Sequence, residues 1–118
     1  MVFNFFIGGF FGTNCWVKLE GDTLYCLKSD FPRPMEEKFI PCGSVQDNPE
    51  WEALLQFLAG CRWERRYDSG ILDGTQWELK VKTEKVKLQS YGSNAYPAEF
   101  KTFQKLLNQI TGKAGVRI

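Results

Sequence analysis

The chain of 118 residues contains no histidine, so the side chain that most often serves as a general base in catalysis is missing. A cysteine nucleophile would need another activating group, and nothing in the sequence marks one. Asp68 and Asp73 are close in sequence, but both fit a turn region better than a catalytic pair. The residue types therefore favour a protein that is not an enzyme.

The four cysteines are scattered along the chain and none forms a Cys-x-x-Cys pair: Cys15, Cys26, Cys42 and Cys61. This spacing gives no support to a tetrahedral zinc site, and we expect neither a metal nor a cofactor. No basic region opens the chain, and its first apolar run, residues 2–11, is broken by polar and glycine residues and too short to span a bilayer. We therefore expect a cytoplasmic protein with reduced thiols and no membrane association.

Basic residues gather on a predicted hairpin. Residues 76–82 and 85–89 alternate between apolar and polar positions, which is typical of half-buried strands. A two-residue loop at Thr83-Glu84 would place Val81 opposite Val86 and set lysines opposite one another on the outward face: Lys80, Lys82, Lys85 and Lys87. Like charges directly opposite are destabilising. The lysines either bind an anionic partner or keep a solvated edge from aggregating.

Nucleic acid is not the expected anionic partner. The net charge is only +1, which provides no overall attraction for a polyanion. Residues 62–67 interleave basic and aromatic side chains, as some nucleic-acid sites do, but acidic residues dilute this patch and no known RNA- or DNA-binding motif is present.

A second candidate site is the polar loop from Ser90 to Tyr96, which precedes a predicted helix. Backbone N–H groups at a helix N-terminus favour anions. The side chains of Ser93 and Asn94 could add hydrogen-bond donors. The rings of Tyr91 and Tyr96 could line a small pocket. The alternative interpretation is that the loop only caps the helix and reverses the chain.

The N-terminal segment is dense in phenylalanine. One interpretation is a buried strand with a bulge at Gly8-Gly9. The other is a subunit interface, because a small domain seldom needs so many phenylalanines in its own core. The candidate interface residues come from this segment and from the hairpin that follows: Phe3, Phe6, Phe10, Phe11, Trp16 and Tyr25. They predict a homodimer or a higher homo-oligomer, most simply with two-fold symmetry.

The elements that position these residues form a single domain, 1–118. N-terminal strands at 2–28 include a hairpin around Gly21-Asp22 that pairs Leu19 with Leu24. A connector at 29–47 contains three prolines, which should exclude regular pairing, and it could cover the outer face of this hairpin. A helix at 48–60, strands at 61–90 and a helix at 97–111 follow. The pattern predicts a two-layer α+β fold, with an antiparallel sheet of about five to six strands built from two hairpins and both helices on one face.

Two motifs carry a resemblance: Asp73-Gly74-Thr75-Gln76-Trp77, and Ser90-Tyr91-Gly92-Ser93-Asn94-Ala95-Tyr96-Pro97. They resemble the C-terminal halves of small bacterial proteins in which a DGTQW strand is followed by a YGSNAYP loop and a phenylalanine-rich final helix. Some of those proteins are carried on mobile, integron-type gene cassettes. The resemblance implies a bacterial origin and brings no catalytic residues with it.

Three hypotheses about function follow. The leading one is an interaction module that associates with itself and binds a protein partner. The second is a binder of an anionic ligand or nucleic acid through the lysine-rich hairpin face. The third is an enzyme of unknown class.

Overall fold

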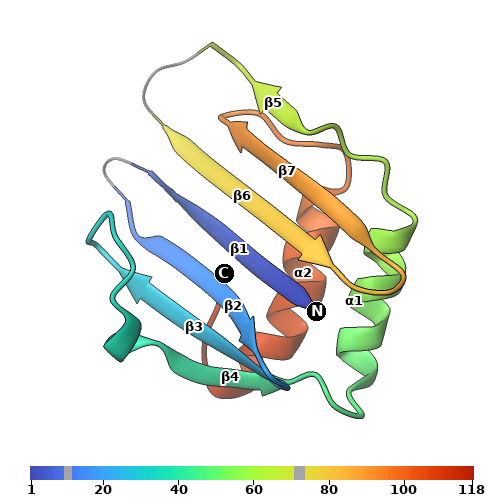
Figure 1. Cartoon of the computed structure of the whole chain (residues 1–118). Helices are drawn as coiled ribbons and strands as arrows, with labels where there is room; N and C mark the ends of the chain where they lie inside the picture. The colour runs from blue at the N-terminus through green and yellow to red at the C-terminus, as the bar shows by residue number, and fades with distance from the viewer. Residues whose placement is uncertain (10–11, 71–73) are drawn as a thin grey trace.

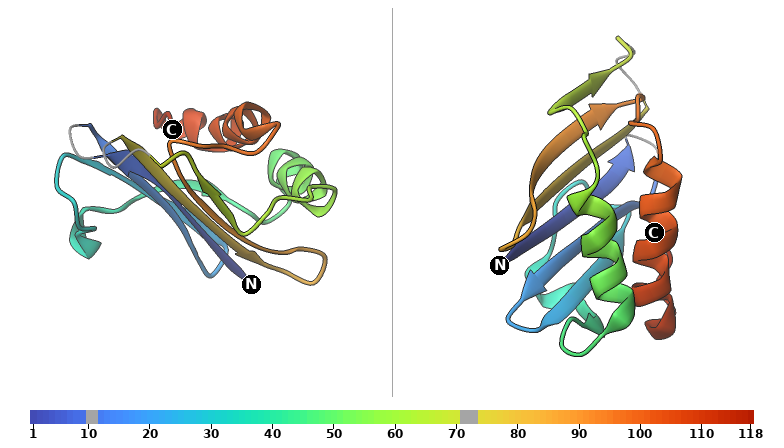
Figure 2. Two further views of the ribbon diagram at one scale, coloured as in Figure 1. Left: turned by 90° about the horizontal axis from the view of Figure 1, so that it is seen from above. Right: turned by 90° about the vertical axis from the view of Figure 1, so that its right-hand side faces the viewer.

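The computed structural model describes residues 1–9, 12–70 and 74–118. Its strands form one sheet of seven, in the order β4-β3-β2-β1-β6-β7-β5, and helices α1 (Pro49–Ala59) and α2 (Phe100–Thr111) pack on one face of it (Figures 1 and 2). The two-layer α+β prediction is confirmed, but the sheet has more strands than expected. The strands are β1 (Val2–Gly9), β2 (Asn14–Glu20), β3 (Thr23–Ser29), β4 (Ile40–Ser44), β5 (Arg66–Asp68), β6 (Thr75–Lys82) and β7 (Lys87–Ser93).

The core lies between the sheet and the two helices. Strand alternation points Phe3 and Phe5 of β1 toward the helices, where both are buried. The ring of Phe3 packs edge-on against Trp51 of α1, with the ring centroids 5.3 Å apart. The ring of Phe5 packs edge-on against Phe103 of α2 at 5.0 Å. The central strand β1 therefore contacts both helices through consecutive inward positions.

The β2–β3 hairpin and helix α1 agree with the sequence prediction. Leu19 pairs with Leu24 across the hairpin, and Gly21 adopts φ +61° in its turn, a conformation that glycine takes without steric cost. The side-chain oxygen of Asn48 accepts hydrogen bonds from the first backbone N–H groups of α1, and Pro49 occupies the first helical position.

The β6–β7 hairpin has a different register from the one expected. Val81 pairs with Leu88 and Lys82 with Lys87, so the predicted opposition of Val81 and Val86 is wrong. The reason is a longer turn, in which the backbone N–H of Thr83 donates to the carbonyl of Val86 at 2.7 Å. The Thr83 hydroxyl also accepts hydrogen bonds from the two backbone N–H groups at the end of this turn. A register shift of two residues leaves every side chain on its predicted face.

The segment predicted as a loop from Ser90 to Tyr96 is partly a strand, since β7 continues to Ser93. The last helix begins at Phe100 rather than at residue 97, so the predicted helix start is wrong. The intervening chain is fixed to the core because Trp77 Nε1 donates to the carbonyl of Ala95 at 2.9 Å. The ring of Tyr96 also stacks on Trp77, with the planes 14° apart.

The connector at 29–47 was expected to lack regular pairing, yet it contains the 3-10 helix η1 (Glu36–Lys38) and strand β4. Pro41 is tolerated in β4 because this is the outermost strand of the sheet, where a missing N–H leaves no neighbour unpaired. A register shift between Leu24 and Tyr25 of β3 accommodates the pairing. The first part of the connector crosses to the sheet face opposite the helices (Figure 2).

A disulfide joins Cys26 of β3 to Cys42 of β4, and both residues are buried. The expectation that all thiols are reduced is therefore wrong for this pair. The spacing along the sequence could not reveal it, because β4 itself was not predicted. Cys15 and Cys61 have free thiols.

Candidate functional site

The sheet face opposite the helices is open along its centre, and its side chains form two rows that cross the strands. The register of β2, β1, β6 and β7 aligns the first row, here named the aromatic row: Trp16, Phe6, Glu78 and Tyr91. The same register aligns the second row, here named the polar row: Lys18, Asn4, Lys80 and Gln89. Strand alternation produces both rows, because every second residue of each strand points away from the helices.

A raised wall from the connector borders these rows on the β2 side. This connector wall consists of Pro32, Pro34, Glu36 and Phe39. The ammonium group of Lys18 donates a hydrogen bond to Glu36 and forms an ion pair with Glu20 at 3.1 Å. The same ammonium lies 4.3 Å from the centroid of the Phe39 ring, a favourable cation–π position. Lys18 therefore fastens the wall to the sheet.

The connector wall is held by charge at Lys18 and by a hydrogen bond at Phe31. The hydrogen bond to the Glu36 carboxylate, and then the Glu20 carboxylate, raises the pKa of Lys18. At the other end of the connector, the side-chain amide of Asn14 donates to the carbonyl of Phe31 at 2.9 Å. Leu27, on the outer face of β3, is 6% exposed. The connector wall therefore shields part of the apolar outer face of the β2–β3 hairpin from solvent.

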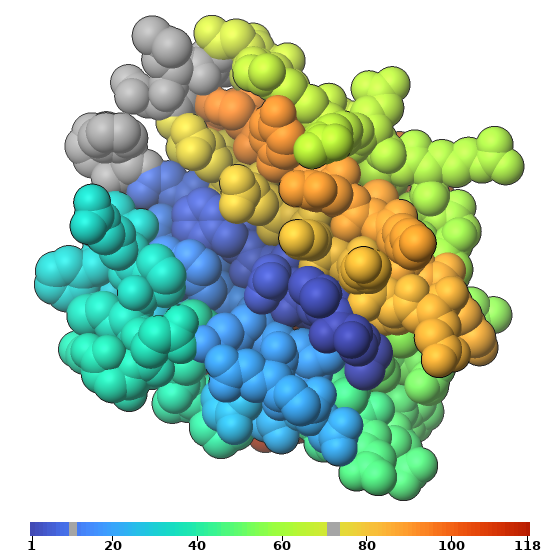
Figure 3. Space-filling model, in the orientation of Figure 1, coloured from blue at the N-terminus to red at the C-terminus, as the bar shows by residue number. Residues whose placement is uncertain are grey.

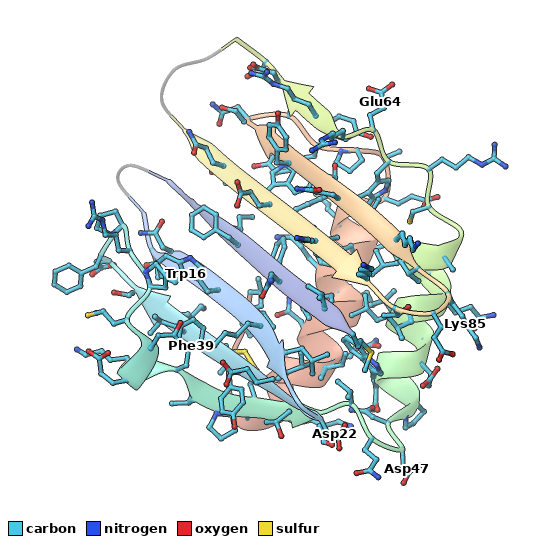
Figure 4. The ribbon with its side chains drawn as sticks, in the orientation of Figure 1. Trp16, Asp22, Phe39, Asp47, Glu64 and Lys85 are labelled. Carbon is cyan, nitrogen blue, oxygen red and sulfur yellow. A yellow bond between two sulfur atoms is a disulfide. The ribbon has the colours of Figure 1, made fainter. Side chains whose placement is uncertain are left out.

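A groove of about 540 Å³ lies between the connector wall and the two rows. Two adjoining hollows of about 280 and 380 Å³ open on the same face. Phe6 lines all three, and its ring packs on Trp16 with the centroids 5.3 Å apart. Figure 3 shows this face, with the wall in teal beside the strands of the sheet, and Figure 4 shows Trp16 and Phe39 together at the wall.

The charges around the groove have both signs. Arg66 and Asp68 of β5 form an ion pair at 3.1 Å, and the Arg66 guanidinium lies 5.8 Å from the centroid of the Tyr91 ring. Hydrogen bonding from the Gly70 N–H, and then the Arg66 charge, lowers the pKa of Asp68. Within the described part of the chain, neither Glu78 nor Lys80 forms an ion pair. These two side chains are therefore free to pair with a partner.

The structure separates the four lysines that were predicted to act together. Lys80 lies in the groove, opposite Gln89. Lys82 and Lys87 face each other near the end of the hairpin. Lys85 lies in the turn between the strands, at the edge of the molecule (Figure 4). The predicted oppositions of Lys82 with Lys85 and of Lys80 with Lys87 are wrong because of the longer turn.

The four predicted binding residues of the 90–96 segment do not share a pocket. Tyr91 lines the groove on the outer face and is 38% exposed, whereas Tyr96 packs against Trp77 and the core residue Phe100. Asn94 adopts φ +53° and its side-chain oxygen accepts the N–H of Thr75 at 2.9 Å.

The carbonyl of Ser93 accepts the N–H of Ser69 at 3.2 Å. Ser93 also lines the hollow beside β5. In this segment only Tyr91 and Ser93 therefore lie on the open face.

The predicted interface residues also divide into groups. Phe3 is completely buried in the core, so it offers no surface to a partner. Phe6, Trp16 and Tyr25 lie half-buried on the outer face. Phe10 and Phe11 lie outside the described residues, as does Asp73 of the carboxylate pair that the sequence suggested.

Several groove residues were not predicted as site residues: Asn4, Glu36, Phe39, Glu78 and Gln89. Alternation along β1, β6 and β7 could have identified three of them as outward-facing. The position of Glu36 and Phe39 had no signal in the sequence, because it depends on how the connector folds back over β2.

Within residues 1–9, 12–70 and 74–118, no group of three or more acidic, cysteine or histidine side chains is placed to hold a metal ion. None of the described helices is long and apolar enough to cross a membrane. Comparison of the chain with protein-family models, curated proteins and solved structures found no match.

Proposed function

We propose that this domain is a protein-interaction module that associates with further copies of itself, and with partner proteins, through the open face of its sheet. The single observation that carries the proposal is the groove between the connector wall and the two rows, with Phe6 at its centre. The central parts of protein interfaces are enriched in aromatic residues and arginine and are bordered by polar groups. Trp16, Phe6 and Tyr91 of the aromatic row, with Arg66 beside Tyr91, belong to these residue types, and Glu78 is the charged member of the row.

The balance of charge supports a protein surface as the partner. The groove is lined by two lysines, Lys18 and Lys80, and two glutamates, Glu36 and Glu78. A site for a polyanion gains its affinity from an excess of positive charge, which is lacking here. Mixed charges around apolar rings instead favour a partner with complementary charges of both signs.

Light scattering tests this proposal. We expect the native protein at micromolar concentration to have at least twice the chain mass of 13.6 kDa, and Phe6→Asp to have the mass of one chain. Ile40→Asp is the matched control, since Ile40 is a 49% exposed apolar residue of edge strand β4 that does not line the groove. A native protein of one chain mass would overturn the proposal. A dimer that survives Phe6→Asp would show that the contact lies elsewhere.

A second candidate function is the binding of an anionic ligand at the end of the β6–β7 hairpin. The opposition of Lys82 and Lys87, with Lys85 in the adjacent turn, motivates it. Since like charges directly opposite are unfavourable, a bound anion would stabilise this end of the sheet. The test is salt-dependent retention on a heparin column, which the double variant Lys82→Gln, Lys87→Gln should abolish. Elution of the native protein in the void volume at low salt would remove this candidate.

The cytoplasmic location expected from the sequence stands as a proposal, and the Cys26–Cys42 bond counts against it because disulfides are rare in the cytosol. Alkylation of thiols in freshly lysed host cells decides between the compartments. A cytoplasmic protein should present four reactive cysteines after denaturation, and a protein from an oxidising compartment should present two.

A further inference from the structure

We infer that the partner on this face is a second copy of the chain, and that the two copies interlock so that the connector wall of each one lies over strands β6 and β7 of the other. This inference rests on the proposed function and specifies its geometry. Three features support this geometry: the shape of the open face, the alignment of the polar row, and the opposite charges of Glu36 and Lys80.

The open face has a high half and a low half. The high half lies over β2 and β3, where the connector wall rises from the sheet (Figures 2 and 3). The low half lies over β6 and β7, where Tyr91 is 38% exposed. In the inferred dimer the open faces of two copies meet, and a two-fold axis lies in the plane between them. This axis runs parallel to the strands and passes between β1 and β6. Rotation about it exchanges the high half of one copy with the low half of the other. Each wall then fits the low half of the other copy, and both contacts are equivalent.

The other simple two-fold arrangement does not fit this shape. An axis in the same plane but perpendicular to the strands would place β2 over β2 and β7 over β7. The two connector walls would then meet each other and hold the sheets apart. Packed sheets are normally about 10 Å apart, so the low halves would lose contact with each other. The shape of the face therefore selects the axis that runs along the strands.

The polar row supplies the charge complementarity. Lys18 of β2 and Lys80 of β6 lie at the same level of the sheet, because both pair with Asn4 of β1. Glu36 is held above this level by its bond to Lys18, yet its side chain remains 75% exposed. An axis along the strands preserves the level of each residue. The rotation therefore brings Glu36 of one copy over Gln89 of the other copy. Lys80 of that other copy lies beside Gln89 on the neighbouring strand.

The same operation pairs residues of the aromatic row across the contact. Trp16 of one copy comes opposite Tyr91 of the other, since β2 and β7 exchange positions and both residues belong to the aromatic row. Phe6 of one copy comes opposite Glu78 of the other, since β1 and β6 exchange positions. The dimer thus combines two Trp16–Tyr91 contacts with two symmetric Glu36–Lys80 pairs.

The test exchanges the two charges. We expect Glu36→Lys and Lys80→Glu each to raise the dissociation constant of the dimer by roughly tenfold or more, because like charges then face each other twice. An equimolar mixture of the two variants should form a mixed dimer, in which each new charge meets an opposite charge. Native mass spectrometry identifies this mixed dimer by its mass, and circular dichroism checks that each variant is folded.

Each result of the exchange supports or overturns the inference. Two weakened homodimers and a restored mixed dimer support it. A dimer that Phe6→Asp disrupts but that neither charge variant weakens overturns the interlocked geometry and leaves the proposed function standing. Glu36→Lys also removes the Lys18–Glu36 pair within one chain, so Lys80→Glu is the deciding variant: a dissociation constant equal to that of the native dimer would overturn the interlocked geometry. A native protein that is monomeric overturns the proposed function itself.

Discussion

Replacement of Phe103 by alanine should remove a fully buried aromatic ring from the centre of the core. The Phe103 side chain is fully buried on α2. Its ring centroid lies 5.0 Å from that of Phe5, 5.8 Å from that of Trp63 and 5.9 Å from that of Phe100. Truncation of a buried phenylalanine to alanine costs about 3–5 kcal/mol. We expect a value of about 4 kcal/mol or more, because three aromatic contacts worth about 0.5–1.5 kcal/mol each are lost as well.

The assay is urea denaturation followed by tryptophan fluorescence. With an m-value of about 2 kcal/mol/M, a loss of about 4 kcal/mol lowers the denaturation midpoint by about 2 M. Lys101→Ala is the matched control, since Lys101 lies on the exposed side of the same helix. It should change the free energy of unfolding by no more than about 0.5 kcal/mol. Equal midpoints for the two variants would refute the assignment of Phe103 to the core.

Three further predictions follow from the buried interior. Reduction of the Cys26–Cys42 bond should lower the free energy of unfolding by about 3 kcal/mol in the chain-entropy estimate for a loop of this size, given the sequence separation of 16. In protein purified without reductant, alkylation under denaturing conditions should label two of the four cysteines. Gly92→Ala should destabilise the fold by about 2 kcal/mol or more and shift the tryptophan emission to longer wavelength, because an added Cβ would lie 2.4 Å from Trp77 Nε1. Burial raises the pKa of the Cys15 thiol, so the folded state holds this proton more tightly than the unfolded state. The free energy of unfolding should therefore be greatest below the ordinary thiol pKa and should fall as the pH rises through the raised pKa. Cys15→Ala should lose less stability over that alkaline range.

Local patterns in the sequence predict much of the secondary structure. The Gly21-Asp22 turn identifies β2 and β3, and alternation identifies β6, because period-2 patterns reflect which face of a strand is buried. Asn48 and Pro49 mark the start of α1, because capping depends only on neighbouring backbone groups. Even where the β6–β7 register was wrong, the assignment of faces was right, since a slip of two residues does not change it.

The predictions that failed depend on contacts between distant segments. The start of α2 at Phe100 reflects the packing of Tyr96 on Trp77, which overrides the preference of proline for a first helical turn. Strand β4 forms in spite of Pro41 because it takes the edge of the sheet beside β3. Local propensity contains no information about which strand lies at an edge.

The sequence by itself determined that this chain folds as an α+β domain and which side chains of the β6–β7 hairpin face outward, with lysines among them. The tertiary structure decided which of those residues meet. Lys18 and Lys80 share one level with Asn4 only because β2 and β6 both pair with β1, and Glu36 reaches Lys18 only because the connector folds back over the sheet. Strand order and loop path are set by the burial of the whole core, so the groove could not be read from any single stretch of the chain.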